Sequence, residues 1–113
     1  MAIYYRDTLD RTFHALGDET RRAMLAMLAR NGEMSAGELG EPFHISQPTA
    51  SKHLRVLERA GLLSRRIEGR AHRFRLRSRP LVEAEGWIAR HRDFWNRTLG
   101  RLGPVLAELD EGG

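Results

Sequence analysis

The residues whose types could do chemistry gather in one third of the chain. The segment ISQPTASKHLRVLERAG at 45–61 combines small hydroxyl side chains, an amide and cations, and an arginine-rich stretch follows it at 62–79. From Gln47 to Arg79 the chain has ten Lys or Arg and two acids, whereas the other residues include nine bases and thirteen acids. A localised basic patch is typical of nucleic-acid binding, although a solvated charged face has a similar composition. The spacing within the patch therefore has to decide between the two.

The first part of the patch, at about 46–60, is predicted to be a helix with two different faces. Ser46 is a suitable N-cap, Pro48 falls in the first turn where its missing N–H costs nothing, and Gly61 suits the end. Aliphatic residues recur at helical spacing on the predicted buried face, namely Ala50, Leu54 and Leu57. At about 100° per residue, polar and basic side chains lie opposite them: Pro48, Ser51, Lys52, Arg55 and Arg59.

The second part of the patch, at about 62–77, is predicted to be a two-stranded ribbon. Strands at 62–67 and 71–76 flank a turn in which Gly69 is able to adopt positive φ. In the second strand, Phe74 and Leu76 alternate with arginines, so one face packs and the other is cationic. A polar helix followed by a basic ribbon suits a helix in the DNA major groove with a wing beside it.

Individual side chains in these two elements have expected DNA contacts. Gln47 suits a bidentate contact to adenine, and Lys52 or Arg55 suits one to guanine. Arg70, at the turn of the ribbon, suits a narrow minor groove. The nearby Arg66 and Arg73 are expected to attract phosphates without reading sequence. For His53, a half-buried structural role competes with DNA contact.

The remaining sequence predicts helices around this patch in a single domain, 1–113. Helices are expected at 8–16, 18–31 and 34–43, with Asp18 capping the second and Ser35 capping the third together with Glu38. A long amphipathic helix is expected at about 80–109. Gly100 and Gly103-Pro104 predict a bend there, or a break into two helices.

Other classes of function find no support in the sequence. The chain has no cysteine, which excludes disulfides and thiolate metal sites and fits a reducing cytoplasm. No apolar run approaches the roughly 20 residues of a membrane span, and the first residues lack the apolar stretch of a signal peptide. No catalytic group, cofactor site or paired zinc ligands stand out, so an enzyme is not expected. The aromatic cluster Trp87, Phe94 and Trp95 is interpreted as hydrophobic core, with a small-molecule pocket as the alternative.

Three segments, ALGDETRRAMLAML, ISQPTASKHLRVLERAGLL and EGRAHRFRL, occur in this order. With them the chain resembles the winged helix-turn-helix repressors of the arsenical-resistance (ArsR) family, from about Phe13 to the last helix. Its C-terminal part looks like the branch without metal-binding cysteines. The resemblance implies a mainly α fold with a small β-hairpin, in the order α-α-α-α-β-β-α. It also implies a homodimeric bacterial repressor with no metal, whose recognition helix enters the major groove and whose wing contacts the minor groove or the backbone.

The resemblance extends to particular residues. Carried over by position, the residues at or near the DNA are Ser46, Gln47, Pro48, Thr49, Ser51 and Lys52. Many family members have histidine where Lys52 stands, which bears on base preference. The terminal helices are expected to form the dimer interface through their apolar residues, with these candidates: Leu9, Phe13, Trp95, Leu99, Leu102 and Leu106.

Three hypotheses follow for what the chain does. The first is a sequence-specific dimeric repressor that binds a pseudo-palindromic operator in double-stranded DNA, with repression of its own gene as one form. The second is a nonspecific, nucleoid-type DNA binder, and the third is a protein-interaction module on the same fold, which the basic face of the 46–60 helix disfavours. An organic ligand, a protein partner and autoregulation without an effector all stay open as the signal.

Overall fold

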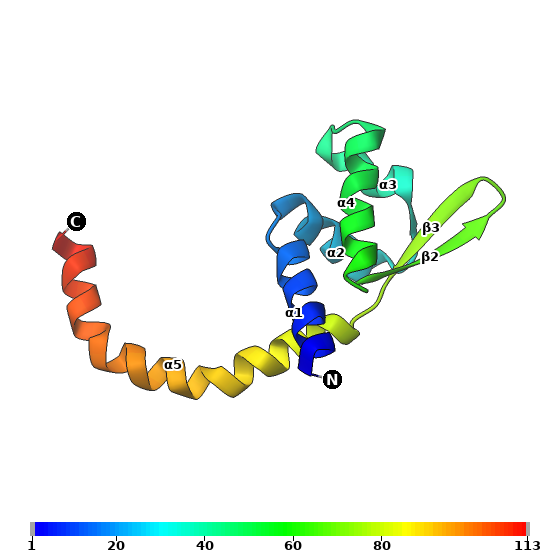
Figure 1. Ribbon diagram of the computed structural model, residues 1–113. Coiled ribbons are helices and arrows are strands. Elements are labelled where there is room, and N and C mark those ends of the chain that lie inside the picture. The colour runs from blue at the N-terminus through cyan, green and yellow to red at the C-terminus, as the bar shows by residue number, and fades with distance from the viewer. Residues whose placement is uncertain (1, 113) are drawn as a thin grey trace.

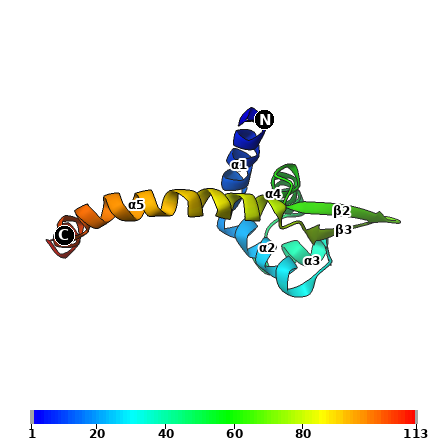
Figure 2. The same cartoon turned by 90° about the horizontal axis from the view of Figure 1, so that it is seen from below.

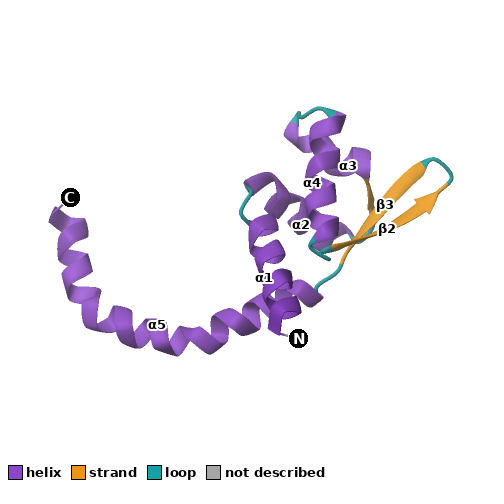
Figure 3. Ribbon diagram, viewed as in Figure 1, coloured by secondary structure: helices purple, strands orange, loops and turns teal. Residues whose placement is uncertain are grey.

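Five α-helices and a small antiparallel sheet make up residues 2–112, which this computed structural model describes without the side chains of residues 2–6, 101–107 and 110–112. Figure 1 follows the elements along the chain, and Figure 3 separates helices from strands. The elements are α1 (Ala2–Leu16), α2 (Glu19–Asn31), β1 (Met34–Ser35), α3 (Ala36–Gly40), the 3₁₀ turn η1 (Glu41–Phe43), α4 (Gln47–Arg59), β2 (Leu63–Glu68), β3 (Ala71–Leu76) and α5 (Arg79–Gly112). The sheet order is β1-β3-β2.

The core lies where α2, α3 and α4 meet the base of the β2–β3 hairpin. The predicted stripe of α4 is buried there, as is the apolar face of α2. Phe74, in the middle of β3, is only 2% exposed and packs among leucines and methionines from every one of these elements. The largest fully buried side chains are Phe74, Met24, Leu28, Leu39, Leu54, Leu57, Leu62 and Thr12. This core holds α4 and the hairpin in one frame.

Three helix starts match the sequence prediction. Asp18 accepts the backbone N–H of Arg21 at 3.0 Å, and this hydrogen bond is the main reason that the pKa of Asp18 is lowered. Ser35 and Glu38 form the complete capping box before α3. Ser46 Oγ accepts the backbone N–H of Thr49 at 3.2 Å at the start of α4. Each cap satisfies N–H groups that the first turn of a helix leaves without a partner.

The third predicted helix, 34–43, is wrong as a continuous element. Met34 and Ser35 instead pair with Phe74 and Arg73 of β3, so the chain has a short third strand that the predicted element order lacked. Since Pro42 has no N–H for an α-helical bond, the segment after α3 tightens into η1. His44, at φ 52°, then reverses the chain into α4.

The two terminal helices differ from their predicted bounds. Helix α1 begins at Ala2, earlier than the predicted position 8. Helix α5 is one element from Arg79 to Gly112, so a break into two helices at Gly103-Pro104 is wrong. Figures 1 and 2 show that α5 curves and that most of its length extends away from the other elements, beyond its contact with α1.

Candidate nucleic-acid interface

Helix α4 presents the polar face that its sequence predicted. With Ala50, Leu54 and Leu57 turned into the core, the other side of the helix is exposed to solvent. Ser46 Oγ donates to Thr49 Oγ1 at 2.9 Å, so the two hydroxyls form a pair at the helix N-terminus. The predicted DNA-facing residues of this segment are all exposed: Ser46, Gln47, Pro48, Thr49, Ser51, Lys52 and Arg55. The structure therefore brings these candidates together on one surface.

An arginine of α2 joins α4 to the C-terminal end of α1. Arg21 donates from Nε to the carbonyl oxygen of Ala15 at 2.8 Å and from Nη2 to that of His14 at 3.1 Å, at the C-terminal end of α1. Its Nη1 lies 3.3 Å from His53 Nδ1 on α4. Because arginine can only donate, Nδ1 of His53 is the acceptor. His53 thus has the structural role considered from the sequence, and Arg21 was missed there.

The hairpin is a regular antiparallel ladder with two distinct faces. Arg66 pairs with Arg73 in register, and Arg65 pairs with Phe74. Side chains alternate across the sheet, so Arg66 and Arg73 share one face while Arg65, His72 and Phe74 share the other. Gly69 turns the chain between the strands with φ 62°, as predicted.

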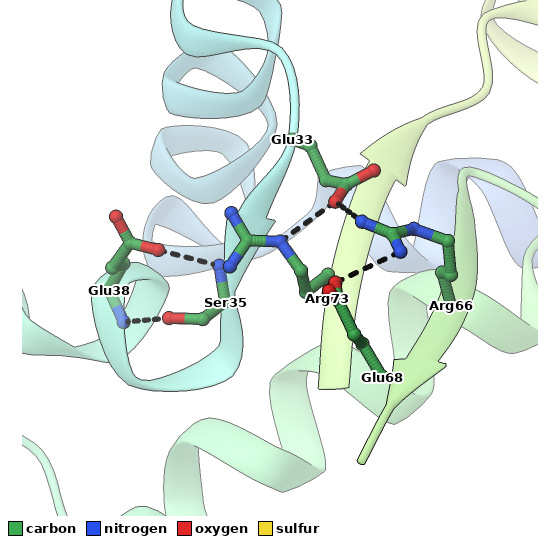
Figure 4. A network of polar contacts seen from close by, with 6 residues as sticks. All are labelled: Glu33, Ser35, Glu38, Arg66, Glu68 and Arg73. Atoms are coloured by element: carbon green, nitrogen blue, oxygen red, sulfur yellow. Dashed lines mark hydrogen bonds and ion pairs between the residues drawn. The ribbon is translucent and has the colours of Figure 1, made fainter. Parts of the chain in front are cut away.

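On the first face, a single acid bridges the two facing arginines (Figure 4). Glu33, from the loop before β1, accepts from Arg66 and, at 2.7 Å, from Arg73 through the same oxygen. Glu68 accepts from Arg66 at 3.0 Å. The hydrogen bonds from Arg66 and then Arg73 lower the pKa of Glu33, and Glu33 in turn raises the pKa of Arg66. Like charges directly opposite in a sheet repel each other, so Glu33 removes a cost of this register.

On the second face, an arginine locks the hairpin to α4. Arg65 donates to both carboxylate oxygens of Glu58, at 2.9 and 3.1 Å, and its guanidinium carbon lies 5.1 Å from the centroid of the Phe74 ring. Its remaining terminal nitrogen lies 3.0 Å from His72 Nδ1. A bidentate pair over an aromatic ring fixes orientation as well as distance. This contact therefore joins α4 to the hairpin at the edge of the core that they share.

The structure divides the arginines that the sequence grouped together. Arg70 lies exposed beside the turn, and the described residues contain no ion pair for it or for Lys52 and Arg55. Arg66 and Arg73 are engaged by acids instead. No local pattern pointed to Glu33, because it lies 33 and 40 residues from its two partners. Strand alternation and the hairpin register predict that Arg65 and Phe74 share a face, but they do not predict the contact between Arg65 and Glu58.

A separate aromatic cluster lies on α5 and α1, away from the basic patch. The Trp87 ring stacks on His91 with centroids 4.4 Å apart, and Trp95 and Phe13 meet Trp87 edge-on at 5.5 and 5.9 Å. Trp87 is half-buried, but Trp95 is 38% exposed and Phe94 is more exposed still. The core interpretation is thus wrong for Phe94 and Trp95 within one chain.

The described part of the chain contains neither a metal-binding cluster nor a membrane-spanning helix. There, no three His, Asp or Glu side chains lie close enough to share a metal ion. No helix among the same residues is both long and apolar enough to cross a bilayer.

A capped polar helix packed against a basic hairpin defines a winged helix-turn-helix protein. A family model described as a helix-turn-helix domain matches residues 16–66. The transcriptional repressor SdpR of Bacillus subtilis is 34% identical over 80 residues, covering 71% of this chain and 88% of that protein. The HTH-type transcriptional regulator Rv2034 of Mycobacterium tuberculosis is 37% identical over 90 residues, 80% of each.

Solved structures agree with these relatives. The ArsR family transcriptional regulator RHA00566 superposes with a TM-score of 0.75 at 33% identity, covering 80% of this chain and 92% of that one. The chain belongs to the ArsR family of winged helix-turn-helix transcriptional regulators, as its sequence motifs predicted. It is therefore a DNA-binding regulator of transcription.

Proposed function

We propose that the protein is a dimeric repressor that binds an inverted-repeat operator. The observation that carries the proposal is the exposed face of α4, which offers an amide, hydroxyls and cations beside a hairpin locked to the same helix. Two such helices related by a two-fold axis would meet successive major grooves about one helical turn apart, roughly 34 Å. A pseudo-palindromic operator follows from that symmetry.

Within this proposal, α4 reads bases and its N-terminal end meets the backbone. Gln47 suits adenine and Lys52 suits guanine in the major groove. Ser46, Pro48 and Thr49 form the first turn, where small side chains allow close approach to a phosphate, and Ser51 lies on the same exposed face. Since Arg66 and Arg73 are held by Glu33, we assign them to the shape of the wing rather than to phosphate binding.

Selection of binding sites from random duplex DNA tests the proposal. We expect the wild-type protein to enrich a palindrome and to protect both half-sites in a footprint at physiological salt. The region upstream of its own gene is then searched for that palindrome, which would support autoregulation. Equal affinity for random DNA would identify a nonspecific binder instead and would overturn the repressor proposal.

The Gln47→Ala variant tests the reading of bases. Loss of a bidentate contact to adenine should reduce operator affinity roughly tenfold while leaving affinity for random DNA unchanged. Glu41→Ala is the matched control, because Glu41 is exposed on the preceding turn and has no proposed DNA contact. A Gln47→Ala variant that keeps its operator preference would contradict base reading by this residue.

For the dimer, we propose that the aromatic face of α1 and α5 packs against a second copy. Phe13, Trp95 and Leu99 are exposed in the single chain, Leu99 at 53%. Leu9, also expected at the interface, is 7% exposed and so lies mainly within its own chain. The side chains of Leu102 and Leu106 lie outside the described ones, and their part stays a prediction.

Sedimentation at micromolar concentration tests this assembly. We expect a dimer for the wild type and dissociation for Trp95→Ala, because large aromatic side chains dominate the energetics of interfaces. Val82→Ala is the control: Val82 is equally part of α5 and is exposed, but it lies on another side of the helix. A monomeric wild type, or a Trp95→Ala variant that dimerises normally, would overturn the proposed interface.

A further inference from the structure

A hollow of about 390 Å³ lies between α4 and the hairpin. Figure 1 shows the two elements diverging from their common base at the start of β2. Leu54 and Phe74 form the apolar part of the lining, and the N-terminal end of α3 contributes Gly37. The polar side chains that line it are Ser35, Ser51, Arg55, Arg65, Arg70 and His72. The volume falls in the range of about 300–1,000 Å³ that is usual for ligand sites.

The charge around this hollow is one-sided. Three arginines and a histidine line it, and no acidic residue is among its lining residues. Glu58, the acid that contacts the lining residue Arg65, is already engaged by it through both of its oxygens. Arg55 and Arg70 have no ion pair with a described acid, so their donors are available to an anion.

The protonation of His72 adds a further donor. Arg65 can only donate, so the 3.0 Å contact to His72 requires the Nδ1 atom to accept. The proton of the neutral ring then resides on Nε2, which leaves an N–H donor on a side chain that lines the hollow. Two cations, a ring N–H and the Ser51 hydroxyl match the donor set that a phosphate group accepts.

We propose that this hollow seats one phosphate of the DNA backbone, bound by Arg55 from α4 and Arg70 from the wing, with Arg65 as a positioning residue. The inference rests on the proposed function. If α4 enters the major groove and the wing tip the adjacent minor groove, the sugar-phosphate strand that separates those grooves must pass between the two elements. The hollow lies there, and the Glu58–Arg65 contact joins the two elements that flank it.

A thermodynamic cycle between one phosphate and one side chain tests the seat. In the selected operator, each phosphate near the boundary between the grooves is replaced in turn by an uncharged methylphosphonate. One position per half-site should lower wild-type affinity about tenfold, as expected for a charge-assisted contact. In Arg70→Ala and in Arg55→Ala the same replacement should cost clearly less, about threefold, because one of the two cationic partners of the phosphate is already missing.

Arg75→Ala is the matched control, because Arg75 is an exposed arginine on the opposite face of β3. It removes the same charge and should leave the full effect of the methylphosphonate. Equal effects of the methylphosphonate in all three variants and the wild type would overturn the seat. Failure of the wild type to select any operator would instead overturn the proposed function, so the two failures are distinguishable.

A free anion is the other source of the same chemistry, and inorganic phosphate tests it. The ring resonances of His72 are followed by NMR as phosphate is added to the full chain without DNA. Saturable shifts that Arg70→Ala abolishes, together with no coupling to any methylphosphonate, would overturn the DNA seat and identify a small-anion site. Coupling on DNA supports the proposal whether or not free phosphate binds.

Discussion

The two faces of the hairpin use the same residue type for opposite purposes. On one face, Arg66 and Arg73 face each other and share Glu33, and Arg66 also pairs with Glu68, so two acids match the two positive charges within the fold. On the other, Arg65 is held by Glu58 while Arg70, at the turn, and Arg55, across the hollow, have no ion pair among the described residues. The positive charge of the wing therefore divides into a structural part and a part available to an external anion.

This difference shows that a count of arginines overstates the DNA-binding charge of a wing. The location of the acids decides which arginines are available, and two of the three acids involved, Glu33 and Glu58, come from outside the hairpin. Glu33 precedes β1 and Glu58 lies on α4, so the division exists only once the chain has folded. Four predictions test the division, from the largest expected effect to the smallest.

Removing the buried aromatic residue of β3 should have the largest effect. Phe74 lies in β3, which pairs with both other strands, and its ring supports Arg65. Phe74→Ala should lower the free energy of unfolding by about 3–5 kcal/mol through loss of burial and creation of a cavity. Urea unfolding followed by circular dichroism measures this. Ile67→Ala, at an exposed position of β2, should cost about 0.5 kcal/mol or less. Equal costs would show that Phe74 is not central to the hairpin.

The salt dependence of operator binding should separate the free arginine from the neutralised one. Each phosphate contact contributes a slope of about −0.9 to the logarithm of the binding constant against the logarithm of salt concentration. Arg70→Ala should reduce the steepness by about that amount. Arg66→Ala should leave it unchanged, because Glu33 and Glu68 already neutralise that guanidinium. Fluorescence anisotropy with labelled operator across a KCl series gives both slopes. Equal losses in the two variants would remove the distinction between the faces.

A change that keeps the charge should isolate the geometry of the Arg65 lock. Arg65→Lys retains the cation but loses the bidentate contact to Glu58 and the planar stacking over Phe74. We expect operator affinity to fall about threefold with an unchanged salt slope, since roughly 0.7 kcal/mol of orientation would be lost. Hydroxyl-radical footprinting should show weaker protection at the wing contacts and normal protection in the major-groove half-site. Arg75→Lys should change neither.

The smallest effect is expected for Glu33, and it should depend on pH. The pKa of Glu33 in the folded protein lies below its ordinary value of 4.5, mainly because Arg66 donates to its carboxylate. Its contribution to stability is therefore complete above about pH 4.5 and is lost as the pH falls through the lowered folded value. Glu33→Gln should reduce the melting temperature slightly at pH 7 and not at all in strong acid. Glu41→Gln controls for the lost charge. A difference that persists in acid would contradict the ionic origin.

Much of this fold was predictable from local signals. The caps at Asp18, Ser35 and Ser46, the buried stripe of α4 and the Gly69 turn all depend on residues within one or two helical turns of each other. The exposure of the predicted DNA-contact residues of α4 also depends on local signals, because helical periodicity alone places them opposite the aliphatic stripe. These parts match the sequence prediction because local chemistry determines them.

The features that the sequence did not reveal depend on distant partners. Strand β1 has two residues and exists only through its pairing with β3, about 40 positions later. Nothing in the residues around Arg21 distinguishes it from other helix arginines, yet its side chain joins α1 to α4. The local breakers at Gly100 and Gly103-Pro104 left a bend or a break open, and the structure has one curved helix through Pro104. The contact of Arg66 and Arg73 with Glu33 was missed for the same reason, since Glu33 is remote from both in sequence.

The cluster in which Trp87 stacks on His91 and meets Trp95 edge-on gives the protein an intrinsic fluorescence probe. The chain has two tryptophans, and both lie on α5 within this cluster, 5.5 Å apart between ring centroids. Helix α4 and the β2–β3 hairpin contain no tryptophan. Intrinsic tryptophan fluorescence therefore originates at the surface proposed for self-association, and a dye-labelled duplex reports separately on the other end of the protein. Dilution and DNA titration then give two independent signals from one unmodified chain.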